Sequence, residues 1–132
     1  MHRMVQILTT LTLGLAVQAN ALASPKQLVT HNLTDHESNA FIAGTVPSQY
    51  PTKAHSTGKV FWAAVRMACF GHIVDDKCPA LIKMDTDTDH PVELGMVELN
   101  VETGEITPQV LHGNGYKFVI NGPGESTITD DN

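Results

Sequence analysis

The fold of this chain is decided by residues 92–129, which read VELGMVELNVETGEITPQVLHGNGYKFVINGPGESTIT. Within this stretch, short runs of apolar residues are separated by turns rich in Gly, Asn and Pro. Tyr116, Phe118 and Ile120 alternate with their neighbours, as in a strand that buries one face. Strands separated by turn signals about every 8–12 residues are typical of a β-sandwich or small barrel. The sequence therefore predicts an all-β domain, a small antiparallel β-sandwich or a barrel-like variant of it.

Two details of the same stretch predict local irregularities. The apolar positions change phase between Leu94 and Val97, so a β-bulge is expected near Gly95. Pro108 interrupts the run over residues 106–111. Because proline has no N–H group for pairing, this run is predicted to be an edge strand.

Residues 59–70, KVFWAAVRMACF, form the most apolar stretch after residue 23, and apolar residues fall on every side of it. Its alanines and the following Gly71 favour a helix. Its aromatic residues and Val65 favour a strand. We predict a central strand that lies antiparallel to residues 80–84, with a helix over residues 59–70 as the alternative.

Residues 24–58 contain several Pro and Gly residues among many polar ones. They are predicted to form an irregular N-terminal segment with short edge strands at residues 28–29 and 41–43, where flanking prolines limit growth. We expect this segment to belong to one domain with the β-rich core over residues 59–132.

The first 23 residues have the layout of a secretory signal peptide. A positively charged start, Met1-His2-Arg3, precedes an apolar run over residues 5–17, and Ala21-Leu22-Ala23 supplies a small-x-small cleavage site. The run is shorter than the roughly 20 apolar residues of a membrane-spanning helix. Cleavage after Ala23 and location in the periplasm or outside the cell are therefore predicted, with an uncleaved anchor as the alternative. No later segment is expected to span a membrane.

The charge of the mature chain disfavours two classes of partner. Without Arg3, seven Lys and Arg residues stand against 14 Asp and Glu residues, a formal net charge of −7. The basic residues are scattered singly, whereas a nucleic-acid-binding protein needs a basic patch. An anionic membrane surface would repel this protein. Neither nucleic acid nor membrane is expected as a partner.

Cys69 and Cys78 are the two cysteines of the chain. In an exported protein, two cysteines close in sequence are expected to form a disulfide. Closing this short loop would stabilise the fold by about 2.5–3 kcal/mol through loss of unfolded-state entropy. The competing hypothesis is a nucleophilic Cys69 with His72 as its base.

Residues 85–89, Asp85-Thr86-Asp87-Thr88-Asp89, suggest a metal site because alternating carboxylates in a loop can surround Ca²⁺. Measured against a helix-loop-helix calcium loop, the pattern fails at the glycine and at the final glutamate. A solvated acidic turn is therefore the favoured interpretation, and Asp85, Asp87 and Asp89 remain weak ligand candidates. No cofactor is expected. Zn²⁺ binding by the six histidines of the mature chain lacks the usual ligand spacing.

Nothing in the sequence indicates a catalytic site, and the Gly-x-Ser-x-Gly motif of many hydrolases is absent. We therefore predict a non-enzymatic binding or interaction protein, a secreted factor or inhibitor whose partner is another protein. If residues 59–70 form a strand, either Phe61 or Trp62 is exposed to anchor that partner. The alternatives are a secreted hydrolase that uses Asp85, Asp87, His90 and His112, and an exported metal-binding protein. The sequence does not predict an oligomeric state.

Overall fold

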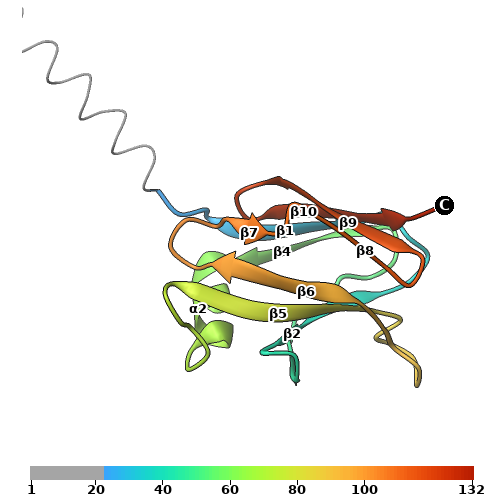
Figure 1. Ribbon diagram of the computed structural model, residues 1–132, viewed down its shortest axis with the longest axis horizontal. Helices are drawn as coiled ribbons and strands as arrows, with labels where there is room; N and C mark the ends of the chain where they lie inside the picture. Colours follow the sequence, from blue (N-terminus) through green and yellow to red (C-terminus); the bar gives the residue numbers. More distant parts are fainter. Residues whose placement is uncertain (1–22) are drawn as a thin grey trace, which may run out of the picture.

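The computed structural model describes residues 23–132, which form two five-stranded β-sheets stacked face to face (Figure 1). The first sheet has the strand order β4-β1-β10-β9-β8, and the second has the order β3-β2-β5-β6-β7. The strands are β1 (Gln27–Asn32), β2 (Ser38–Ile42), β3 (Val46–Pro47), β4 (Ser56–Phe61), β5 (Lys77–Met84), β6 (Val92–Asn100), β7 (Ile106–Thr107), β8 (Val110–Gly113), β9 (Tyr116–Gly122) and β10 (Glu125–Asp130). One helix, α2 (Trp62–Cys69), connects β4 to β5. The predicted all-β sandwich is confirmed.

The core lies between the sheets because alternate side chains of each strand point inward. Along β5, every second residue from Cys78 to Met84 is buried. Tyr116 and Phe118 of β9 and Ile128 of β10 supply the facing side of the core. The period-two pattern seen in the sequence is therefore the pattern that packs the two sheets.

The two predicted irregularities are present. The pairing of β5 with β6 shifts register between Ile82 and Lys83, directly opposite Gly95. A Cβ atom at Gly95 would lie 3.0 Å from Cδ1 of Leu111, so any larger residue there would push this side chain aside. Pro108 separates β7 from β8, which are edge strands of different sheets.

The central strand predicted for residues 59–70 is wrong. The strand β4 ends at Phe61 and is an edge strand, and the next eight residues form α2. The buried residues of this helix are Trp62, Val65 and Cys69, whose spacing of three and four residues defines one helical face. The apolar residues left on the exposed sides of the helix obscured that period in the sequence.

The partner predicted for residues 80–84 is also wrong. These residues lie in β5, which pairs antiparallel with β2 and β6 and has no pairing with β4. Because the helix ends the first strand, the chain crosses from the first sheet to the second before β5 begins.

The N-terminal strands are interior strands, which differs from the predicted edge strands at residues 28–29 and 41–43. The strand β1 lies between β4, its antiparallel neighbour, and β10, its parallel neighbour. The strand β2 lies between β3 and β5. Each of these strands has at least one neighbour from a distant part of the sequence, β10 for β1 and β5 for β2, so the polar local composition gave no signal of this position.

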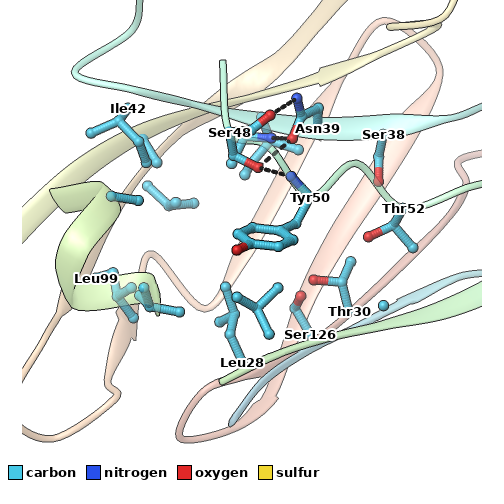
Figure 2. A pocket seen from close by; sticks show the side chains of 18 of the residues that line it. Leu28, Thr30, Ser38, Asn39, Ile42, Ser48, Tyr50, Thr52, Leu99 and Ser126 are labelled. Carbon is cyan, nitrogen blue, oxygen red and sulfur yellow. Dashed lines mark hydrogen bonds between the residues drawn. The ribbon is translucent and has the colours of Figure 1, made fainter. Parts of the chain in front are cut away.

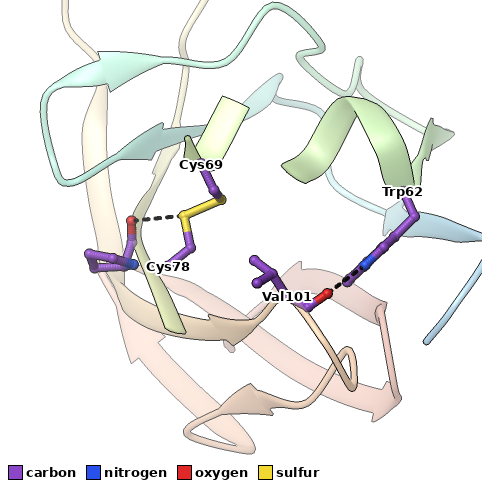
Figure 3. The surroundings of a disulfide bond; sticks show 5 residues. Trp62, Cys69, Cys78 and Val101 are labelled. Carbon is purple, nitrogen blue, oxygen red and sulfur yellow. Dashed lines mark hydrogen bonds between the residues drawn. A yellow bond between two sulfur atoms is a disulfide. The ribbon is translucent and has the colours of Figure 1, made fainter. Parts of the chain in front are cut away.

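Three contacts hold α2 against the end of the second sheet. A disulfide joins Cys69, the last helical residue, to Cys78 in β5 (Figure 3). The indole Nε1 of Trp62 donates a hydrogen bond of 2.8 Å to the carbonyl oxygen of Val101. Arg66 forms an ion pair of 2.7 Å with Glu102. The predicted disulfide is present, and with its sulfur in that bond, Cys69 is not a free nucleophile.

The signal peptide predicted for residues 1–23 lies, apart from Ala23, outside the described residues. Over residues 23–132, no helix has both the length and the apolar character needed to cross a membrane.

Candidate functional site

A cavity of about 120 Å³ lies between the two sheets, beside β4 and beneath α2 (Figure 2). Strands β1, β4 and β10 line it from the first sheet, and β2, β5 and β6 line it from the second. The helix α2 lines one end through Ala64, Val65 and the exposed Ala68. The cavity is therefore lined by elements from most of the described chain and is partly open to the solvent.

Small residues leave this space unfilled. Ala40, Gly58, Ala64, Ser38 and Ser126 all line the cavity, where larger side chains would fill it. At Gly58, a Cβ atom would lie 2.6 Å from the Thr52 hydroxyl oxygen, so glycine makes room for that side chain. The cavity thus exists because small side chains line parts of its wall.

Hydroxyl groups gather at one end of the cavity. They belong to Thr30, Ser38, Thr52 and Ser126, which converge from β1, β2, a loop and β10 (Figure 2). Ser38, Thr52 and Ser126 expose only 3%, 7% and 2% of their surface. Figure 2 shows no hydrogen bond from these hydroxyls to the other side chains drawn. Within residues 23–132, every fully enclosed polar side-chain atom has a hydrogen-bond partner, so hydroxyl oxygens without a protein partner keep some accessible surface.

Tyr50 lines the cavity while half of its surface stays exposed, so we place it at the mouth; in Figure 2 its ring lies above Leu28 and to the left of Ser38 and Thr52. The loop that carries Tyr50 is held against β2. The Asn39 side chain bonds the backbone oxygen and the hydroxyl of Ser48 at 2.9 and 2.8 Å, and the Ser48 hydroxyl accepts a 3.0 Å bond from the Tyr50 amide. The side chain of Tyr50 itself is half exposed.

The second notable feature is an exposed apolar surface on α2 and its flanks, which we call the α2 surface. It consists of Phe61, Met67, Phe70, Ile73 and Val74. Phe61, Met67, Phe70 and Val74 expose 74%, 78%, 84% and 73% of their surface. Phe61 is thus the exposed aromatic residue at the β4–α2 junction, and the adjacent Trp62 is buried.

The acidic loop does not assemble a metal site. Asp85 Oδ1 lies 2.5 Å from His36 Nδ1, while Asp87 and Asp89 are exposed. Among the described residues, no three His, Cys, Asp or Glu side chains gather in a way that could hold a metal ion. Of the three aspartates that the sequence grouped together, Asp85 is thus held by a histidine, and Asp87 and Asp89 face the solvent.

The residues considered for a hydrolase are not brought together either. His112 pairs with Asp131 at 2.7 Å, Asp85 pairs with His36, and Asp87 and His90 are exposed. His31 and His55 form similar surface pairs with Glu125 and Asp35.

Two pKa values in this part of the molecule are shifted for identifiable reasons. A hydrogen bond from His55, and the positive charge of that imidazole, lower the pKa of Asp35. Burial raises the pKa of Tyr116, and the nearby Asp85 and Asp130 charges add to this. These shifts arise from ordinary surface pairing and core burial, and neither group faces the cavity.

Sequence reasoning missed the hydroxyl-lined cavity entirely. Thr30, Ser38, Thr52 and Ser126 are far apart in the chain and belong to no motif. Only the stacking of two sheets brings them together, so no local signal could have found them.

A family model described as T2SS substrate NttC matches residues 1–131. The chain belongs to the NttC family. A crystal structure of the Legionella pneumophila type II secretion system substrate NttC is similar to it, with 51% sequence identity and a TM-score of 0.80. That similarity covers 81% of this chain and 99% of the solved chain. No protein in the curated comparison matches. Membership of the NttC family implies export across the cell envelope.

Proposed function

We propose that this chain acts after export as a non-enzymatic binding protein, whose partner is another protein that contacts the α2 surface. The observation that carries the proposal is the exposure of four large apolar side chains within residues 61–74. Exposed apolar patches on soluble proteins commonly mark interaction sites. Aromatic residues and Met are also enriched at the centres of protein interfaces.

The rigidity of α2 supports this function. The disulfide and the Trp62 hydrogen bond hold the helix from both of its ends, so the exposed side chains start from a fixed backbone. A fixed backbone reduces the conformational entropy lost on binding. Met67 lies in the last turn of α2 and Phe70 directly follows the helix, so both exposed side chains lie near the helix end that the disulfide fixes.

The route of export is part of the proposal. We propose that signal peptidase cleaves after Ala23 and that the mature protein is released outside the cell. The N-terminal pattern and the membership of a family of secretion substrates support this. The intact mass of protein from the culture medium should match residues 24–132 less two hydrogens for the disulfide. A mass that includes residues 1–23 would contradict cleavage.

Site-specific photo-cross-linking tests the proposed surface. A photoreactive phenylalanine replaces Phe70 in one protein and Leu33 in a matched control. Leu33 is also exposed, and it follows the end of β1 opposite to the end that pairs with Phe61. After irradiation in the exported fraction, a discrete covalent adduct is expected from position 70 only. Introducing Met67→Ser should reduce that adduct. Equal adducts at both positions, or none at position 70, would contradict the proposal.

A further inference from the structure

The cavity between the sheets has the features of a ligand site that is separate from the α2 surface. One end is apolar, the other carries hydroxyls without protein partners, and a half-exposed tyrosine stands at the mouth. We propose that this cavity binds a small uncharged molecule with an apolar body and one hydrogen-bonding group, such as a short-chain alcohol or ketone.

The lining determines that the ligand is uncharged. Of the described residues that line the cavity, none is Asp, Glu, Lys, Arg or His. A charged group would lose its hydration here without gaining an ionic partner, which is strongly unfavourable. Leu28, Ile42, Val65 and Leu99 instead offer contacts to an aliphatic or aromatic body.

The hydroxyl end determines where the polar group of the ligand lies. Each hydroxyl can donate one hydrogen bond and accept others. Ser38, Thr52 and Ser126 are more than nine-tenths buried, and their oxygen atoms are not among enclosed atoms left without a partner, so each can still hydrogen-bond a molecule that enters. A ligand hydroxyl or carbonyl placed among these side chains would form the hydrogen bonds that the protein leaves open.

The cavity volume limits the size of the ligand. A cavity of about 150 Å³ lined by apolar side chains holds benzene. The cavity here, of about 120 Å³, therefore suits a ligand of a comparable number of non-hydrogen atoms.

Titration with 1-hexanol, followed by NMR of the isotope-labelled, disulfide-bonded mature protein, tests the proposal. Saturable shifts are expected for amides of β1, β2, β10 and the inward face of α2. Hexanoate, which has the same chain length but is charged, should bind at least tenfold more weakly. Shifts that do not saturate would overturn the proposal and indicate a cavity that holds only water. Shifts that gather around Met67 and Phe70 would also overturn it, because they would place hexanol on the α2 surface.

Two variants test separately whether binding needs the space in the cavity and whether it needs the hydroxyl groups at the polar end. Ala64→Leu places extra volume in the cavity and should abolish binding. Ala63→Leu is the matched control, because Ala63 is the exposed neighbour on the same helix and should leave binding unchanged. Thr30→Val keeps the side-chain shape and should raise the Kd for hexanol about fivefold through loss of one hydrogen bond.

A second readout keeps the test decisive if Ala64→Leu does not fold. In that case Thr30→Val, together with the hexanoate comparison, decides the outcome. Unchanged hexanol affinity in Thr30→Val, with equal binding of hexanoate, would overturn the proposal. The photo-cross-linking result at Phe70 is independent of this cavity, so failure of one proposal is distinguishable from failure of the other.

Discussion

The buried side chain of Asn32 organises the turn that follows β1. Its amide nitrogen donates hydrogen bonds to the carbonyl oxygens of His36 and Thr52, at 2.7 and 3.2 Å. Its amide oxygen accepts bonds from the backbone and the hydroxyl of Thr34, at 3.1 and 2.8 Å. One fully buried residue thus joins the end of β1 to the loop that carries Tyr50.

Asn32→Ala is expected to destabilise the fold by about 2–3 kcal/mol, because it leaves several buried polar groups without partners. Thermal and urea unfolding of the mature protein measure this change. Gln49→Ala, at an exposed position of the nearby loop, serves as the control and should change stability by less than about 0.5 kcal/mol. Equal stability of the two variants would show that the Asn32 network contributes little.

The pair of Asp35 and His55 predicts a pH dependence. Because the pKa of Asp35 is lowered in the folded state, its stabilising effect is fully present above the ordinary value of 3.8. That effect is lost as the pH falls through the lowered pKa. NMR titration of the Asp35 carboxyl carbon should therefore show a higher midpoint in His55→Gln than in the wild type. An unchanged midpoint would mean that His55 does not cause the shift.

At the scale of secondary-structure elements, the two sheets come into close contact where β8 lies beside β6. A Cβ atom at Gly113 would lie 2.1 Å from the backbone oxygen of Leu94, and a backbone atom cannot move aside as a flexible side chain can. Glycine at this position therefore allows the edge of the first sheet to contact the second.

Gly113→Ala is expected to destabilise the protein by about 1–3 kcal/mol through overpacking. The comparison is Gly122→Ala, because no atom lies within 4 Å of a Cβ placed at Gly122. Unfolding midpoints should fall clearly for the first variant and change little for the second. The reverse order would show that the β6–β8 contact tolerates a side chain.

At the scale of the whole molecule, the first and last strands of the sandwich pair with each other. The strand β10 lies between β1 and β9 in the first sheet, parallel to β1 and antiparallel to β9. Its residues Ser126 and Ile128 are buried in the core and line the cavity. Folding of the first sheet therefore requires both ends of the described chain.

A chain that stops after Gly124 lacks β10 and is expected to lose its cooperative unfolding transition. A chain that stops after Asp130 loses Asp131 and Asn132, with the His112 pair and the hydrogen bond from the Asp131 amide to the Gly115 oxygen, and should remain folded. Circular dichroism during heating distinguishes the two. A cooperative transition in the shorter chain would show that the remaining nine strands fold without β10.

The alternation over residues 92–129 determined the sandwich by itself, because a strand that buries one face requires period-two apolar residues regardless of its partner. The bulge at Gly95 and the edge position near Pro108 were readable for the same reason, since each depends on the backbone chemistry of one residue. The disulfide of Cys69 with Cys78 followed from export and short spacing.

Tertiary structure alone decided the remaining features. The helix over Trp62–Cys69 depends on which side of an all-round apolar segment meets the sheets, and the interior position of β1 depends on a parallel partner almost a hundred residues away. The cavity with its four hydroxyls depends on residues from three strands and a loop that meet only when the sheets stack. Local periodicity reports which face of an element is buried, whereas strand order and the shape between two layers arise from contacts between distant segments.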